Sequence, residues 1–254
     1  MNLFKSLAAT ALLSSSLFAQ ATSVDEIIST YHENIGGVEA LKQLKGVKMT
    51  GNFQQGQMQF PIEIVNLDSG KTYTKFSVQG KDFKQAVYDG ETLWSINMMT
   101  LKPEKSTAED TYNFSLNSND FPDALMDYKA KGYTAELVGT ETVEGADAYK
   151  IKLTQEPIKL EGKEVPNVSY HYFDADSMVL VMTETELHSG PMKGATQIMK
   201  FSDYQEVDSL YFPFAIMSEI KGQPGGSPIT IKSVELNPSV DNAVFDFPTA
   251  PAAE

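Results

Sequence analysis

The side chains best suited to acid–base or metal chemistry are three histidines, and they lie far apart in the chain, as His32, His171 and His188. His171 is followed by Asp174, and His188 is preceded by Glu184 and Glu186, so each histidine could form a metal site with a nearby carboxylate. None of these residues belongs to an H-E-x-x-H motif or to another spacing typical of zinc ligands. We therefore expect structural or solvent-exposed histidines and no bound metal.

Paired carboxylates are the second possible source of chemistry. Asp174 and Asp176, and likewise Glu184 and Glu186, occupy alternate positions, which places each pair on one side of an extended chain. Such pairs could serve a glycosidase or a proton transfer, but a turn followed by a solvated strand face explains them as well. No serine lies in a G-x-S-x-G motif. The sequence thus favours a protein that is not an enzyme and needs no cofactor; loss of turnover on mutating these carboxylates would reveal the alternative.

The apolar residues say more about function. The chain holds 11 methionines, and methionine is frequent on surfaces that accept apolar partners of variable shape. With aromatic residues on the same predicted faces, they indicate a hydrophobic concavity that binds a ligand. The alternative is that these side chains fill a solid core. The candidate ligand-binding residues are Met49, Phe53, Met58, Phe60, Ile62, Phe76, Trp94, Ile96, Met98, Leu125 and Met126.

Two helices are expected before the first strand. Ser23 and Glu26 have the spacing of a capping box, and apolar residues then recur at helical spacing until Gly36 and Gly37. A second, short helix is expected over residues 38–44. The polar side of the first helix is acidic, which is the wrong sign for binding a membrane surface. We expect it to pack on a sheet.

From Val47 onward, apolar and polar residues alternate with the period of two that is typical of antiparallel strands with one buried face. About eleven or twelve strands are expected, and such a sheet tends to curl or close because it twists and exposes its edges. A β-sandwich competes with this arrangement. We predict a mainly β fold with helical covers (α+β): a strongly curved antiparallel sheet that forms an incompletely closed β-barrel. The strands are expected at 47–54, 57–64, 71–79, 83–88, 92–97, 134–141, 148–154, 168–173, 178–187, 197–204, 211–220 and 229–236.

Residues 98–132 interrupt the strand pattern. Within them, residues 120–128 have the form of a helix initiated by Pro122 and closed at Gly132. Interruptions longer than about 12 to 15 residues are usually functional or disordered. We expect a helical flap or plug over the concave side, with a plain surface insertion as the alternative.

The chain begins with a segment typical of exported proteins. Lys5 precedes an apolar run, and Ala19-Gln20-Ala21 forms an A-x-A cleavage site, so residues 1–21 are predicted to be a signal peptide and residues 22–254 one domain. The whole chain has a net charge of −14 and no cysteine, which argues against nucleic-acid binding, disulfides and a lipid anchor on cysteine. We expect a soluble, exported monomer.

A hairpin around the single tryptophan gives the first resemblance to a known family. The sequence Asp89-Gly90-Glu91-Thr92-Leu93-Trp94 resembles a landmark of the LolA-like outer-membrane lipoprotein carriers of the Gram-negative periplasm. Further segments are similar to that family's later hairpins and to its C-terminal pattern, and together they cover nearly the whole mature chain. These segments are residues 172–176, 178–180, 201–204, 207–213, 237–238 and 241–248.

The resemblance implies a half-open barrel with helices over its mouth that shields the acyl chains of lipoproteins, or related lipids, in the periplasm. It implies an inner-membrane release complex and an outer-membrane acceptor as partners. A regulatory protein, similar to the periplasmic stress sensors of the same fold, is the alternative. The family's carriers use an arginine on an early strand to hold their covers closed. This chain has no arginine, and Lys48 lies in the comparable region without arginine's planar fork.

Overall fold

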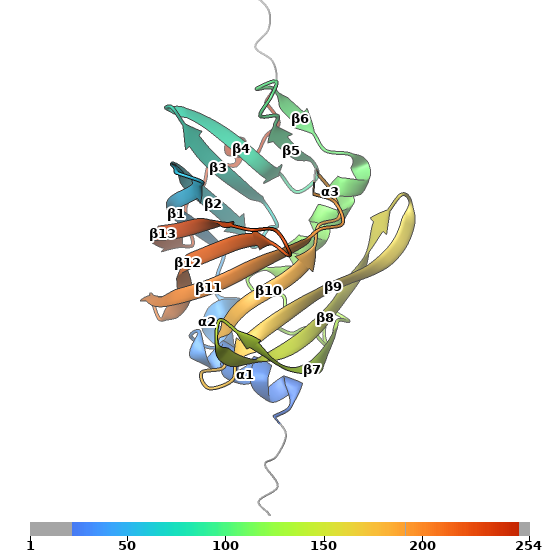
Figure 1. Ribbon diagram of the computed structural model, residues 1–254. Helices are drawn as coiled ribbons and strands as arrows, with labels where there is room; N and C mark the ends of the chain where they lie inside the picture. The colour runs from blue at the N-terminus through green and yellow to red at the C-terminus, as the bar shows by residue number, and fades with distance from the viewer. Residues whose placement is uncertain (1–21, 191, 249–254) are drawn as a thin grey trace, which may run out of the picture.

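Thirteen strands make up the sheet of the computed structural model, which describes residues 22–190 and 192–248 (Figure 1). The predicted signal peptide, residues 1–21, lies outside the described residues. The strands are β1 (Gly46–Gln55), β2 (Met58–Leu67), β3 (Thr72–Val78), β4 (Lys81–Tyr88), β5 (Leu93–Ile96), β6 (Pro103–Lys105), β7 (Thr134–Val143), β8 (Ala146–Leu160), β9 (Lys163–Asp174), β10 (Leu180–Glu186), β11 (Thr196–Val207), β12 (Leu210–Ile220) and β13 (Gly226–Leu236).

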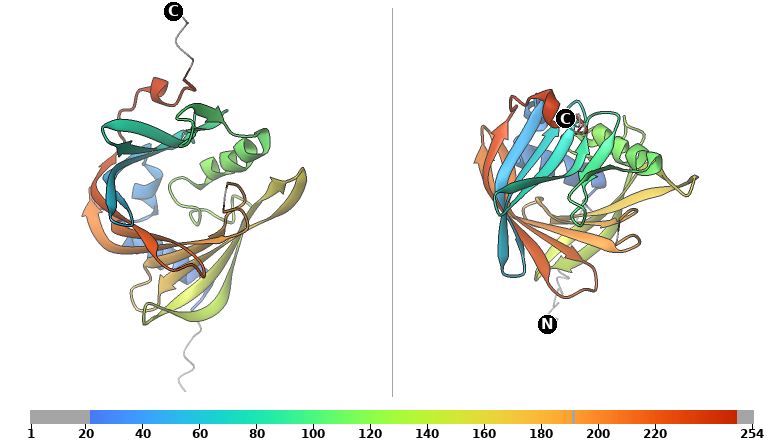
Figure 2. Two further views of the ribbon diagram at one scale, coloured as in Figure 1. Left: turned by 45° about the horizontal axis from the view of Figure 1, so that its top comes forward. Right: turned by 90° about the horizontal axis from the view of Figure 1, so that it is seen from above.

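All thirteen strands belong to one antiparallel sheet in the order β6-β5-β4-β3-β2-β1-β13-β12-β11-β10-β9-β8-β7. The first and last strands of the chain therefore pair in the middle of the sheet, and β6 and β7 form its two edges. The prediction of a mainly β fold is confirmed, and a single sheet rules out the sandwich. The sheet is open, because its edge strands do not pair with each other, and it bends around the helical segments on its concave side (Figure 2).

The strand prediction missed β6 and underestimated the lengths of β8 and β9. β6 begins at Pro103, inside the segment 98–132 that was expected to contain no strand. β8 and β9 extend well beyond residues 154 and 168, through a β-bulge between Gln155 and Ile158. Pro157 and Pro166 make these extensions hard to predict from the sequence, because proline is rare inside a sheet except at edges and bulges.

Register divides the sheet into two faces. Residues directly opposite one another on paired strands share a face, so Met49, Phe53, Ile62 and Phe76 lie on one side. We call this the inner face, because Met49 packs there against the helices. The opposite side, which carries Trp94, is the outer face.

Helix α1 (Val24–Asn34) begins at Ser23, whose hydroxyl oxygen accepts a hydrogen bond from the Glu26 backbone at 3.2 Å. Helix α2 (Val38–Lys42) follows after Gly36 and Gly37, both at positive φ. The apolar side of α1 and the end of α2 pack on the inner face of β8, β9 and β1. Both predicted helices are confirmed, and they form the main core with residues of the segment before β7.

The predicted helix at residues 120–128 is wrong. The regular helices of the insertion lie earlier, as α3 (Ala108–Ser115) and the 3₁₀ helix η1 (Leu116–Asp120), and residues 121–133 form successive turns. Asp127 has a φ of 51°, which no α-helix accommodates. This winding path buries Leu125, Met126 and Tyr128 together against α1, as the core requires.

A second core lies on the outer face beneath the C-terminal segment 237–247, which includes the 3₁₀ helix η2 (Asn242–Val244). Trp94 is 1% exposed, and its indole N–H donates to the backbone oxygen of Phe245 at 2.8 Å. Phe245 is fully buried among Val65, Tyr73 and Trp94. The tryptophan hairpin thus anchors the end of the chain to the back of the sheet.

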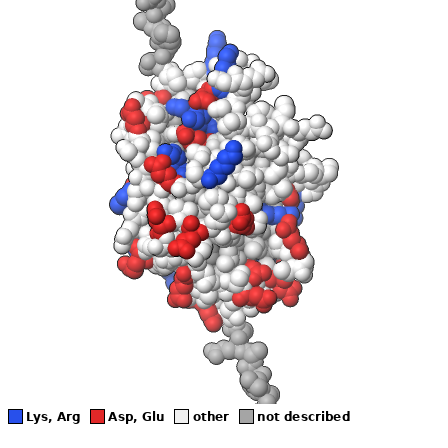
Figure 3. All heavy atoms as spheres, turned by 90° about the vertical axis from the view of Figure 1, so that its left-hand side faces the viewer, with Lys and Arg blue, Asp and Glu red and all other residues white. Residues whose placement is uncertain are grey.

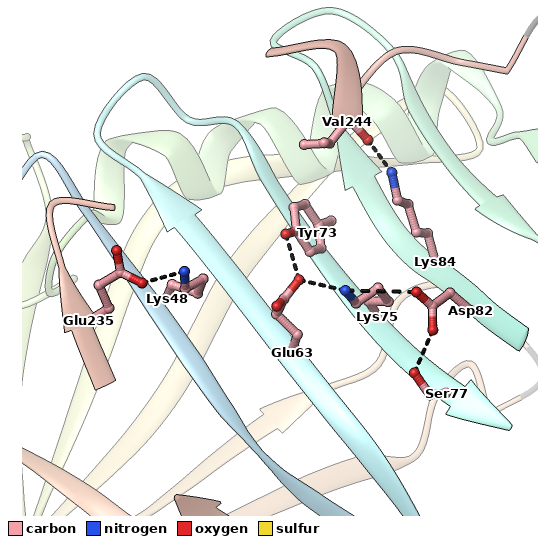
Figure 4. Close-up of polar contacts among 9 residues, drawn as sticks. All are labelled: Lys48, Glu63, Tyr73, Lys75, Ser77, Asp82, Lys84, Glu235 and Val244. Atoms are coloured by element: carbon pink, nitrogen blue, oxygen red, sulfur yellow. Dashed lines mark hydrogen bonds and ion pairs between the residues drawn. The ribbon is translucent and has the colours of Figure 1, made fainter. Parts of the chain in front are cut away.

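Polar residues cover the rest of the outer face of β1–β4 (Figure 4). Glu63 accepts hydrogen bonds from Tyr73 at 2.8 Å and from Lys75 at 2.9 Å, and Lys48 forms an ion pair with Glu235. Burial alone would raise the pKa of Glu63, but these contacts hold it below its ordinary value.

Within the described residues, none of the helices has the length and apolar character needed to cross a membrane.

Candidate functional site

A cavity of about 380 Å³ lies between the inner face and the helices. Its wall is mostly apolar and comes from α1, α2, the end of α3, the turns after η1 and the inner faces of β1, β11 and β12. The volume is within the range of ordinary small-molecule sites, about 300 to 1,000 Å³. Its apolar lining includes Tyr31, Ile35, Met49, Phe121, Phe201 and Phe212.

Beyond the cavity, the inner face continues as an apolar surface that the helices leave half-exposed. Phe53 and Phe76 contact each other there, with ring centroids 5.6 Å apart. Phe60 lies directly opposite Phe53 and is also half-buried. Partly exposed aromatic residues next to a cavity extend the surface that an apolar ligand could cover.

One charged side chain is fully built into the cavity wall. The Asp123 carboxylate accepts hydrogen bonds from the Tyr31 hydroxyl at 2.9 Å and from the Leu125 backbone at 2.7 Å, and His32 Nε2 lies 3.7 Å away. Burial would raise the pKa of Asp123, but the nearby His32 ring and the hydrogen bonds from Tyr31 and Leu125 outweigh it and hold that pKa below its usual value. Asp123 thereby joins the turns after η1 to helix α1.

This junction makes a testable contribution to stability. Tyr31→Phe removes the hydroxyl that donates to the buried carboxylate, and a hydrogen bond to a charged group contributes roughly 1.5 to 3 kcal/mol. We expect the free energy of unfolding, measured by chemical denaturation, to fall by about that amount. The control is Tyr211→Phe, which removes an exposed hydroxyl bonded to Glu206 and is expected to change stability by less than about 0.5 kcal/mol. Equal effects in the two variants would contradict this role of Asp123.

A second carboxylate, Asp120, lies at the edge of the same cavity. It accepts hydrogen bonds from Gln155 at 2.6 Å and from the Tyr133 hydroxyl at 3.1 Å. Burial is the main cause of the raised pKa of Asp120. Both carboxylates are occupied by protein donors, so they position the turns around the cavity.

The predicted ligand-binding residues separate into four groups. Met49 lines the cavity, and Phe53, Phe60, Ile62 and Phe76 share its face of the sheet. Leu125 and Met126 are buried in the main core, Trp94 and Ile96 pack on the outer face beneath the C-terminal segment, and Met58 and Met98 are exposed at hairpin ends. The structure thus brings the first group together and separates the others from it.

Sequence reasoning overlooked the residues that come from the helices and from the second half of the sheet. Tyr31 and Ile35 follow from the apolar stripe of α1, and Phe201 and Phe212 from the alternation of β11 and β12. Those patterns indicate a buried side, but they do not say that the side borders a cavity. The sequence did not indicate a role for Asp123, because no motif or spacing relates this residue to α1.

The residues considered for catalysis do not converge. Asp174 bonds to Ser177 in the turn after β9, with both bonds at 2.7 Å. Glu184 pairs with Lys221 at 2.8 Å on the outer face, whereas His171 lies on the inner face. Within the described residues, no group of three or more histidines and carboxylates is placed to hold a metal ion.

Comparisons with known proteins support the fold. No protein-family model and no curated protein matches the sequence. Among solved structures, LolA superfamily protein NE2245 from Nitrosomonas europaea matches with 12% identity over 89% of this chain and 98% of that chain, at a TM-score of 0.51.

Two further structures agree with this match. A DUF1329 family protein from Desulfovibrio piger shares 15% identity over 88% of this chain and 97% of its own, at a TM-score of 0.53. A putative outer membrane lipoprotein-sorting protein domain from Vibrio parahaemolyticus shares 9% over 86% and 95%, at a TM-score of 0.51. At these identities the likeness concerns the fold alone, and the chain described here has the fold of the LolA superfamily.

Proposed function

We propose that this protein is a periplasmic carrier that binds the acyl chains of lipoproteins or related lipids between its inner face and its helices. It receives its cargo from an inner-membrane release complex and delivers it to an outer-membrane acceptor. The observation that carries the proposal is the apolar cavity of about 380 Å³, which continues into the half-exposed aromatic residues of β1–β3.

The energetics of acyl chains suit such a site. Each CH₂ group that leaves water contributes about 0.8 kcal/mol, so a chain of ordinary length gains several kcal/mol even when it is only partly covered. Phe53, Phe76 and Phe201 offer many weak contacts and no directional bond. A carrier built this way binds chains of variable shape and can release them again.

The segments that cover the cavity must be held in place by a contact other than an arginine side chain, because the chain has no arginine. Lys48 is not that connection, because it faces the outer surface and pairs with Glu235 (Figure 4). Asp123 instead ties the turns after η1 to Tyr31 and His32 of α1. We include this junction in the proposal as the contact that holds the cover over the cavity.

Binding of a neutral apolar probe tests the function. We expect the protein to bind N-phenylnaphthylamine with a rise in its fluorescence, and a triacylated lipopeptide to displace the probe. Phe201→Asn places a polar amide in the cavity wall and should weaken probe binding by about tenfold or more, because the amide is desolvated without a partner.

The matched control is Phe247→Asn, which changes a half-buried phenylalanine on the outer face. It should bind the probe as the unmodified protein does, once circular dichroism shows that both variants are folded. Trp94 emission should also stay constant when the lipopeptide alone binds, since the indole lies on the opposite side of the sheet. Failure of the unmodified protein to bind either probe or lipopeptide would refute the carrier function.

A further inference from the structure

The turns of three neighbouring hairpins lie at the same end of the sheet. Strand order β6-β5-β4-β3-β2-β1 is antiparallel throughout, so the turns 56–57, 79–80 and 97–102 all lie at one end of these strands. The turns 56–57 and 79–80 are two strand spacings apart, or about 10 Å. We call these three turns together the hairpin patch, and a shallow hollow joins Met58 and Phe60 to Val78 and Gln79 across the first two of them.

The hairpin patch exposes large apolar side chains in an unusual concentration. Met99 is 91% exposed, Met98 54%, Leu101 56% and Met58 61%. Together with Val138, which is 55% exposed, these four are the most exposed of the large hydrophobic residues among the described ones. Three of them occupy a single turn of six residues, and exposed apolar groups gathered in this way mark interaction sites.

The turn that carries three of these residues is rigid. The Asn97 side-chain oxygen accepts hydrogen bonds from the backbones of Met99 at 2.8 Å and Thr100 at 3.1 Å, and the Asn97 backbone oxygen accepts from Leu101 at 2.7 Å. Leu101 holds a φ of 57°, where glycine would be favoured. The turn thus presents its apolar side chains in a fixed shape, with little entropy left to lose on binding.

The segment of the chain that carries two of the three turns, residues 71–105, has a charge opposite to that of the whole chain. The whole chain has 20 lysines and 34 carboxylates, whereas residues 71–105 hold six lysines and four carboxylates. On the face shown in Figure 3, lysines gather in the upper part, the level at which β3–β6 lie in Figure 1, and carboxylates predominate below. The lysines are Lys71, Lys75, Lys81, Lys84, Lys102 and Lys105, and the carboxylates are Asp82, Asp89, Glu91 and Glu104.

We propose that the hairpin patch docks the protein on an anionic lipid bilayer, with Met98, Met99 and Leu101 entering the interface. Lys81 and Lys102, both exposed, lie beside the apolar residues at the same end of the sheet. Apolar side chains flanked by lysines are the combination that binds a negatively charged membrane surface. The acidic remainder of the molecule is repelled by that surface, which orients the protein with this patch toward it. The docking surface is separate from the cavity and would serve loading or delivery of lipid cargo.

Vesicle sedimentation tests the proposal. The full-length mature protein should bind vesicles of phosphatidylethanolamine and phosphatidylglycerol at low salt, bind less as salt is raised, and bind weakly to phosphatidylcholine alone. Met98→Asp combined with Met99→Asp should weaken binding by about tenfold or more. Leu137→Asp combined with Val138→Asp makes the same chemical change at two exposed positions of edge strand β7 and should leave binding unchanged.

Each other outcome has a defined meaning. Absence of vesicle binding by the unmodified protein, or equal loss in both double variants, would overturn the proposal. If Met98 and Met99 proved necessary for capturing a protein partner but not for vesicle binding, the patch would be a protein interface and the membrane proposal would be wrong. Phe201→Asn should keep vesicle binding while losing the apolar probe, so failure of docking and failure of the carrier function are distinguishable.

Discussion

Phe245→Ala is expected to lower the free energy of unfolding by about 3 to 5 kcal/mol, the usual cost of deleting a fully buried phenylalanine. Phe245 is fully buried, its ring lies 5.6 Å from that of Tyr73, and its backbone oxygen accepts the hydrogen bond of the Trp94 indole. The substitution leaves a cavity between the sheet and the C-terminal segment, which loses its main anchor. Chemical denaturation followed by tryptophan fluorescence measures the effect where it arises, since Trp94 is the only tryptophan.

Phe247→Ala provides the comparison. Phe247 also contacts Trp94, with ring centroids 5.8 Å apart, but it is only half-buried. We expect a clearly smaller loss of stability, because part of its surface is already in water. If Phe245→Ala cost less than about 1 kcal/mol, the C-terminal segment would not stabilise the sheet in the way described.

The tryptophan hairpin shows both what the sequence could predict and what it could not. The turn at Asp89 and Gly90 was expected, and Gly90 has a φ of 104°. However, the turn spans four residues, because the Asp89 side chain accepts hydrogen bonds from the backbones of Glu91 and Thr92 at 2.8 and 2.7 Å. Trp94 was expected in the binding concavity and lies on the outer face, because a strand pattern shows that two faces differ without saying which one a distant segment will cover.

For the residues near the cavity, the face of the sheet could be predicted from the sequence, but the path of the insertion could not. Alternation placed Met49, Phe53, Phe60 and Phe76 on one face, and the register confirms that grouping. The insertion was harder to predict: Leu125 and Met126 were expected to lie in a helix, but burying both beside Tyr128 requires turns, with Asp127 in a left-handed conformation. Local propensity favours the helix, and tertiary packing against α1 overrides it.

The second large effect concerns pH and His171, on the inner face of β9. Burial lowers the pKa of His171 from an ordinary value of 6.5 to about 4, and the nearby charge of Asp123 opposes this shift only in part. One imidazole nitrogen lies 3.0 Å from the Ser169 hydroxyl, and the other has no hydrogen-bond partner among the described residues. The folded protein therefore holds this ring neutral where the unfolded chain would protonate it.

The direction of the pH dependence follows from proton binding. Between pH 6.5 and about 4 the unfolded chain binds a proton at His171 that the folded protein does not bind, so the free energy of unfolding falls as the pH falls through this window. Below that window both states are protonated and the loss is complete. A shift of this size corresponds to a loss of about 3 kcal/mol at most.

His171→Gln should remove this dependence. Chemical denaturation between pH 7 and pH 5 reports mainly on the histidine, since carboxylates with lowered pKa values, such as Asp123, lose their contribution only at lower pH, and Asp120, whose pKa is raised, acts in the opposite direction as the pH falls. Over this range the variant's stability should stay nearly flat, while that of the unmodified protein declines. Ser169→Ala keeps the imidazole and removes only its neighbour, so the decline should persist there. An equally steep decline in His171→Gln would mean that another group, and not the buried imidazole, makes the fold sensitive to mild acid.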